Sequence, residues 1–259
     1  MPEKINSQFG VPHGRELPIN QNVFALIDRI AELPSNWHDA GSVSLKVLRA
    51  IARHAEQISP ITHSAETGCG RTTLLFSHLS SNHLVFALDA GRSLSQTRDS
   101  ALLNPQNVTF IEGPSQVTLP NYSFNHKVQI ALIDGPHGYP FPDLEYYYFY
   151  PQIETGGLLL VDDLQIPSIG RMFDIIDASD MFNLIEIVGN MAIFKRSDAP
   201  LIDPLSDSWW IQGYNRAHYE EITRQKFSLL GGLAYITPRP LKMMIPASVK
   251  EKLWLWTER

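Results

Sequence analysis

Three short stretches, each of which reads as a buried strand that ends in an acid or a glycine loop, constrain the fold of this chain more than any other feature. With their endings they are residues 61–70 (ITHSAETGCG), 128–137 (VQIALIDGPH) and 157–163 (GLLLVDD). Short, continuously apolar runs are typical of strands that are covered on both faces, as in parallel sheets. In an open α/β sheet, the carboxyl ends of the strands form a common ligand-binding edge. The sequence therefore predicts a glycine loop, three carboxylates and a histidine around one crevice.

Strand and helix patterns alternate along most of the chain, which predicts a doubly wound α/β fold with helices on both faces of a mostly parallel sheet. Two further strand patterns flank Gly189-Asn190, a pair typical of hairpin turns. We therefore expect a seven-stranded sheet that closes with an antiparallel hairpin. The predicted strands are 61–65, 84–88, 108–111, 128–133, 158–161, 183–188 and 191–196, and the predicted core helices are 72–79, 93–103, 143–150 and 166–178.

The regions outside this alternation are expected to pack on it, giving a single globular unit. Residues 1–58 read as an irregular arm followed by a cap of two helices, 23–33 and 43–58. Residues 59–196 form the expected core. Residues 197–259 form an extension with helical patterns at 208–230 and 250–256, and its sequence indicates no chemistry.

Composition narrows the class of protein. The 259 residues carry a formal net charge of -6, which argues against a general binder of nucleic acid, because such proteins present basic surfaces. The single cysteine, Cys69, excludes an internal disulfide and fits a reducing compartment. The amino-terminal residues lack the apolar core of a signal peptide, and no apolar run is long enough to span a bilayer. We expect a cytoplasmic protein without membrane or nucleic-acid partners; assembly into a homo-oligomer stays open.

The glycine loop at residues 66–73 suits an anionic or nucleotide-like ligand, because glycines allow close approach of the backbone and the helix amino end favours negative charge. It lacks the Gly-Lys-Ser/Thr ending of a phosphate-binding P-loop. Thr73 stands where a dinucleotide-binding loop has its third glycine, which disfavours NAD. Asp89 follows the next strand, where an acid can accept hydrogen bonds from ribose hydroxyls. The alternative is a plain strand-to-helix turn.

The acids at the later strand ends suit a divalent cation. Asp134, Asp162 and Asp163 offer the oxygen ligands that Mg²⁺ prefers, and converging acids repel one another unless a cation or a proton intervenes. Alternatively, one acid caps the following helix and another binds backbone amides. His137 follows Asp134 by one tight turn and can act as a general base, although most lone histidines are structural or solvated.

The loop at residues 66–73, the acid Asp89 and the closing hairpin resemble class I S-adenosylmethionine-dependent methyltransferases, which have a Rossmann-like fold. The run Gly113-Pro114-Ser115-Gln116 is similar to the adenine-contacting segment of catechol O-methyltransferase-like enzymes. The resemblance covers residues 60–196. It implies a cofactor site that comprises Glu66, Thr67, Gly68, Gly70, Thr72, Asp89, Gly113, Ser115, Gln116 and Asp134.

The segment from Asp134 to His137 and the later acid pair resemble metal-dependent sugar O-methyltransferases. This resemblance implies a divalent metal, expected to be Mg²⁺, on Asp134, Asp162 and Asp163. It also implies catalytic roles for His137, as the base, and for Asp134. Catechol-type relatives have Asn at the position of Asp163 and a lysine base, but no lysine closely follows Asp134 here.

The implied function is S-adenosylmethionine-dependent O-methylation of a hydroxyl on a small molecule such as a sugar or natural product. One alternative is a binding protein that kept the cofactor fold without the chemistry. Another is a different enzyme on the same site, such as a metal-dependent hydroxylase or hydrolase. This second alternative is weakened because no set of two histidines and one carboxylate stands out in the sequence.

Overall fold

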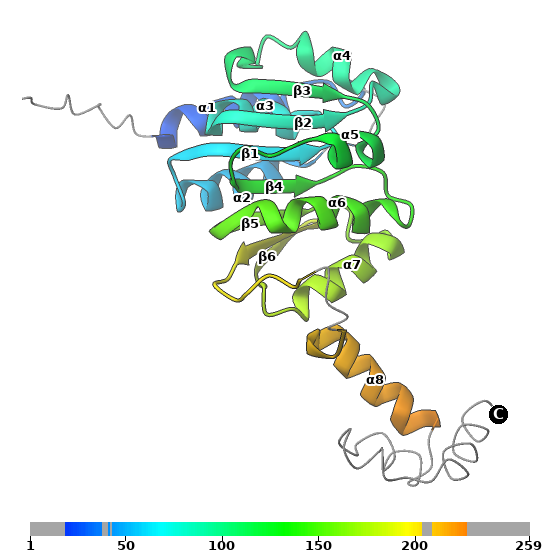
Figure 1. The fold of residues 1–259 in the computed structure, drawn as a ribbon. Coiled ribbons are helices and arrows are strands. Elements are labelled where there is room, and N and C mark those ends of the chain that lie inside the picture. The colour runs from blue at the N-terminus through cyan, green and yellow to red at the C-terminus, as the bar shows by residue number, and fades with distance from the viewer. Residues whose placement is uncertain (1–18, 38–40, 42, 204–208, 227–259) are drawn as a thin grey trace, which may run out of the picture.

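The computed structural model describes residues 19–37, 41, 43–203 and 209–226. The arm at 1–18 and the predicted helix at 250–256 lie outside the described residues. Seven strands form one sheet in the order β3-β2-β1-β4-β5-β7-β6 (Figure 1). They are β1 (Ile61–Thr67), β2 (Ser80–Ala87), β3 (Val108–Glu112), β4 (Val128–Ile133), β5 (Ile153–Val161), β6 (Phe182–Val188) and β7 (Met191–Arg196).

The pairing confirms the predicted sheet. Strands β1 to β5 pair in parallel, whereas β7 runs antiparallel to both β5 and β6. The hairpin between β6 and β7 turns at Gly189-Asn190, as the sequence predicts, with Gly189 at a φ of 61°. The order of the sheet reverses beside β1, so the edge where β1 and β4 end is the expected place for a ligand.

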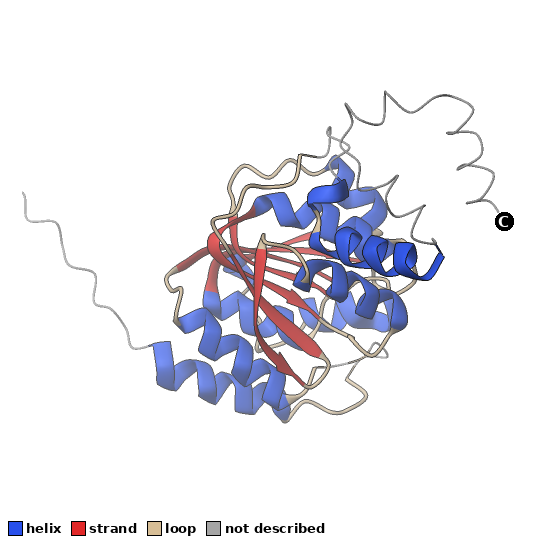
Figure 2. Ribbon diagram, turned by 90° about the horizontal axis from the view of Figure 1, so that it is seen from below, coloured by secondary structure: helices blue, strands red, loops and turns tan. Residues whose placement is uncertain are grey.

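Helices lie on both faces of this sheet (Figure 2). One face carries α1, α2 and α3, and the other carries α5, α6 and α7 (Figure 1). The helices are α1 (Ile19–Ala31), α2 (Leu45–Glu56), α3 (Arg71–Leu79), α4 (Ser93–Arg98), α5 (Ser115–Asn121), α6 (Phe141–Phe149), α7 (Pro167–Asp177) and α8 (Gly213–Lys226).

Strand β5 shows why its sequence is apolar without interruption. Leu158 and Leu160 pack in the core beneath α1, α2 and α3, whereas Leu159 and Val161 pack in the core beneath α6 and α7. Successive side chains of a strand point to opposite faces, so a strand covered on both sides needs apolar residues at every position. All four side chains are at most 1% exposed.

Several elements differ from the sequence-based expectation; β2, for example, begins at Ser80 and not at residue 84. Helix α5 is not among the predicted helices, because Gly113 and Pro114 are turn residues and Pro120 interrupts a short helical pattern. Strand β5 begins at Ile153 rather than at residue 158, since two glycines hide the strand pattern there. Helix α4 ends at Arg98, five residues before the predicted end at Leu103. None of the described helices combines the length and apolar character needed to cross a membrane.

Candidate active site

The carboxyl ends of the parallel strands surround one cleft of about 400 Å³, a volume suited to a cofactor-sized ligand. Each loop that follows a strand contributes to its wall. The lining includes Gly68 and Cys69 after β1, Leu88 and Ala90 after β2, Gly113 and Ser115 after β3, Asp134 and His137 after β4, and Asp162 and Asp163 after β5. The structure therefore brings the predicted strand ends together at one edge.

Gly68 forms the closest approach between the glycine loop and the neighbouring strand end. Its φ is +78°, and a Cβ atom at this position would lie 2.2 Å from the carbonyl oxygen of Asp134. The Gly68 amide donates to the carbonyl of Phe86 on β2. A side chain here would push β1 and β4 apart, so the width of the cleft depends on this glycine.

Four of the predicted cofactor residues, Gly68, Gly113, Ser115 and Asp134, line the cleft. The hydroxyl of Ser115 and Oε1 of Gln116 are buried and have no hydrogen-bond partner among the described residues. Buried polar atoms are usually paired, so the Ser115 hydroxyl, which belongs to the lining, marks a place where a polar ligand fits. The other predicted residues lie beside the lining without belonging to it; they are Glu66, Thr67, Gly70, Thr72, Asp89 and Gln116.

Asp89 lies at the mouth of the cleft, between the lining residues Leu88 and Ala90. It is exposed, and its Oδ1 accepts hydrogen bonds from the amide and the hydroxyl of Ser95, at 3.0 and 3.2 Å. Oδ2 takes no part in these two bonds. The carboxylate is thus fixed in orientation while one oxygen faces away from the Ser95 contacts.

Three of the predicted catalytic and metal residues converge at the ends of β4 and β5. One ligand atom each of Asp134, His137 and Asp163 lies within 4.8 Å of the others. Nε2 of His137 is 3.0 Å from Oδ2 of Asp163. Asp162 lines the cleft as well but is not in this group of mutually close atoms. Asp163 has a φ of 60°, a strained conformation for a residue with a side chain.

The surroundings of the acids in this cleft disfavour their ionised, negatively charged forms. Burial, followed by the charges of Asp162, Glu66 and Asp163, holds the pKa of Asp134 well above its usual range. Burial also raises the pKa of Asp162, with Asp163 adding to the effect. A divalent cation would relieve this repulsion, and carboxylate oxygens with a histidine nitrogen form a suitable donor set. The residues present therefore fit a metal ion.

Helix α7 holds the loop that carries His137. The hydroxyl of Ser168 donates to the carbonyl oxygen of His137. The guanidinium of Arg171 lies 2.8 Å from Oδ2 of Asp143 and 4.6 Å from the centre of the Tyr139 ring. These contacts attach the second half of the loop between β4 and α6, and the first turn of α6, to one helix, so α7 holds the backbone at His137 in place.

Glu145 on α6 is a buried acid of the site that sequence reasoning missed. It is fully buried; its Oε2 accepts a 2.8 Å hydrogen bond from Thr67, and its Oε1 has no hydrogen-bond partner among the described residues. A Cβ atom on Gly135 would lie 1.9 Å from Oε1, so a side chain there would have to displace the Glu145 carboxylate. A sequence signal existed, because Glu145 shares a helix face with the buried residues Pro142 and Phe149.

Glu145 also makes stability depend on pH. Burial raises its pKa to about 7 from 4.5, and the hydrogen bond from Thr67 opposes this shift only in part. As the pH rises, the unfolded chain loses this proton before the folded chain does. The contribution of Glu145 to the free energy of unfolding is therefore fully present below pH 4.5 and is lost as the pH rises through about 7. Glu145→Gln stays neutral, so we expect it to gain roughly 2–3 kcal/mol over the wild type between pH 4.5 and pH 8.

Urea unfolding of both proteins across this pH range checks the prediction. The exposed Glu56→Gln serves as the control and should run parallel to the wild type. Parallel curves for Glu145→Gln and the wild type would contradict a raised pKa at Glu145.

Comparison with known families identifies the kind of domain that contains this cleft. Residues 65–164 match the family model of a methyltransferase domain. This chain carries a methyltransferase domain. The match runs from the end of β1 to the loop after β5 and includes every predicted catalytic and metal residue, and the order of the sheet with its antiparallel hairpin is that of the class I methyltransferase fold. No curated protein sequence matches the chain at a significant level.

Solved methyltransferase structures share the fold. The similar structures include a methyltransferase from Geobacter sulfurreducens, at 14% identity and a TM-score of 0.51, covering 71% of this chain and 93% of that one. The O-methyltransferase TomG from Streptomyces achromogenes, solved with SAM, has 12% identity and a TM-score of 0.51, covering 66% and 89%. The cofactor-bound protein Rv0187 from MTB has 16% identity and a TM-score of 0.51, covering 71% and 92%. At these identities the likeness concerns the fold.

Proposed function

We propose that this methyltransferase transfers a methyl group from S-adenosylmethionine to a hydroxyl of a small molecule, such as a sugar or natural product, with Mg²⁺ as the divalent metal. The observation that carries the proposal is the convergence of Asp134, His137 and Asp163 at one end of the cleft that the glycine loop lines. A base and a cation site beside a cofactor cleft suit an acceptor whose hydroxyl has to lose a proton.

Residues at both ends of the cleft support the proposal that its ligand is S-adenosylmethionine. Gly68 leaves room for the backbone to approach a ligand beside Asp134, and the unpartnered hydroxyl of Ser115 lies where the resemblance places the adenine. Asp89 stands between them at the position expected to bind the ribose. TomG, which shares the fold, was solved with this cofactor.

We assign Asp134 and Asp163 as metal ligands, with Asp162 beside them. Bound metal would lower the pKa of an acceptor hydroxyl. His137 is assigned as the base: its ring is 46% exposed, so it can reach an acceptor, and Asp163 orients it through Nε2. The imidazole would accept the hydroxyl proton, S-adenosylmethionine would supply the methyl group to the oxygen, and S-adenosylhomocysteine would be released.

The contact between His137 and Asp163 also favours a second version of the reaction, in which an oriented histidine acts without metal. Release of S-adenosylhomocysteine from a panel of hydroxylated acceptors, with and without EDTA, separates the two. The metal-dependent version predicts loss of at least nine-tenths of the turnover in EDTA and its recovery with Mg²⁺. Undiminished turnover in EDTA would favour the metal-free pair, and no turnover with any acceptor would favour a binding protein.

A further inference from the structure

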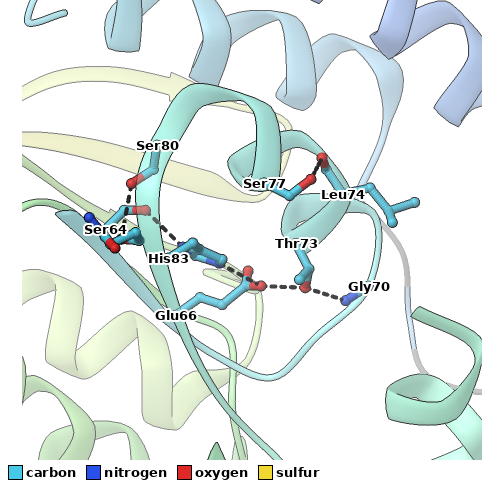
Figure 3. A network of polar contacts seen from close by, with 9 residues as sticks. Ser64, Glu66, Gly70, Thr73, Leu74, Ser77, Ser80 and His83 are labelled. Atoms are coloured by element: carbon cyan, nitrogen blue, oxygen red, sulfur yellow. Dashed lines mark hydrogen bonds and ion pairs between the residues drawn. The ribbon is translucent and has the colours of Figure 1, made fainter. Parts of the chain in front are cut away.

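A buried chain of hydrogen bonds lies behind the glycine loop and includes a histidine that no motif predicts. His83 on β2 and Glu66 on β1 are at most 1% exposed, and Figure 3 shows the contact that joins them. Nδ1 of His83 lies 2.8 Å from the Ser64 hydroxyl, and Nε2 lies 3.1 Å from Oε1 of Glu66. Ser64 and His83 are direct partners in the parallel register of β1 and β2. The histidine therefore belongs to the rigid sheet and not to a loop.

The chain continues from Glu66 to the loop. The Thr73 hydroxyl donates to the same oxygen, Oε1 of Glu66, and accepts the amide N–H of Gly70 at 2.9 Å. Each hydrogen is used once, because a carboxylate only accepts and a hydroxyl both donates and accepts. Gly70 is the residue at which the loop enters α3. The sheet is thus connected through two side chains to the end of the loop that lines the cleft.

Glu66 depends on these partners for its position. Its other oxygen, Oε2, is buried and has no hydrogen-bond partner among the described residues, so the two bonds to Oε1 hold the carboxylate. Glu66 does not line the cleft, whereas Gly68 and Cys69 of the same loop do. A carboxylate at this depth can affect a bound cofactor only indirectly, through the loop that it holds. Linked buried hydrogen bonds of this kind reinforce one another.

We propose that His83, Glu66 and Thr73 form a positioning relay that fixes the glycine loop in its cofactor-binding conformation, with His83 as a positioning residue of the enzyme. The relay explains Thr73, which occupies the place of a dinucleotide-loop glycine and here supplies the hydroxyl that the loop amide needs. The inference rests on the proposed cofactor, because it assigns the relay to the binding of S-adenosylmethionine.

Thr73→Val and Thr73→Ser form the matched test pair, since valine keeps the shape and serine keeps the hydroxyl. We expect Thr73→Val to raise the Kd of S-adenosylhomocysteine about tenfold, a typical loss for a buried hydrogen bond to a charged group. Thr73→Ser should bind within about twofold of the wild type. With a saturating cofactor, kcat of Thr73→Val should be nearly unchanged, because the relay does not touch the acceptor. His83→Phe, which keeps a ring beside Phe76, should weaken binding by a similar factor.

Ser77→Ala is the control for stability alone. Ser77 is a buried residue of α3 that donates to the Leu74 carbonyl and accepts from Asn104, with no bond to the relay. The Ser77→Ala substitution should lower Tm without changing the Kd of S-adenosylhomocysteine. Wild-type affinity in a folded Thr73→Val or His83→Phe would overturn the relay, as would an equal loss of affinity in Ser77→Ala. Absence of binding by the wild type would instead overturn the proposed cofactor.

Discussion

Replacing His137 with alanine is expected to lower kcat by roughly 100- to 10,000-fold, the usual contribution of a positioned general base. The Kd of S-adenosylhomocysteine should change by less than about threefold, because the imidazole contacts Asp163 and not the glycine loop. His63→Ala is a suitable control: His63 stacks on His126 at a ring distance of 4.6 Å, near the opposite ends of the strands. It should leave both constants unchanged.

The same variant distinguishes a base from a metal ligand, since His137 also belongs to the group of close ligand atoms. If His137 is the base, added imidazole should restore part of the turnover and additional Mg²⁺ should not. If it is a ligand, the Mg²⁺ concentration for half-maximal turnover should rise and excess metal should restore kcat. Unchanged turnover in His137→Ala would remove both roles.

Gly68→Ala is expected to weaken cofactor binding by roughly ten- to hundredfold, because a positive φ with a side chain costs about 1–3 kcal/mol. The added Cβ would lie 2.2 Å from the carbonyl oxygen of Asp134 and 3.2 Å from its carbon, and both are backbone atoms that cannot rotate away. Relief of this overlap requires β1 and β4 to separate at the cleft.

Titration of the variant with S-adenosylhomocysteine, together with its Tm, measures this effect. Gly138→Ala is the matched control, since a Cβ there would have nothing within 4 Å and the residue does not have a positive φ. It should bind as the wild type does. Wild-type affinity in Gly68→Ala would mean that the loop does not set the width of the cleft.

The sheet was predictable because its signals are local. The run at residues 157–161 is typical of a strand covered on both faces, and Gly189-Asn190 is typical of a hairpin turn. Helix α5 gave no such signal, since it is short and includes Pro120. Its existence depends on packing, as the complete burial of Leu119 in the core beneath α6 shows.

The convergence of Asp134, His137 and Asp163 was predictable, because each of them follows a strand end. The site was not predictable where tertiary packing assigns the partners. His83 lies on the same face of β2 as the buried residues Val85 and Ala87, so its burial could be predicted from the sequence. Its contact with Glu66, however, arises only from the register between two strands. Glu145 becomes a site residue because α6 places it against Thr67 and Gly135.

Isothermal titration of the purified protein with S-adenosylmethionine, S-adenosylhomocysteine and NAD, each with and without Mg²⁺, tests the central claim most directly. Our account predicts binding of the first two at roughly micromolar Kd, near −8 kcal/mol, and no binding of NAD. Binding of NAD, or no binding of either methyl cofactor, would contradict it, because the glycine loop would then not form the cofactor site proposed for it.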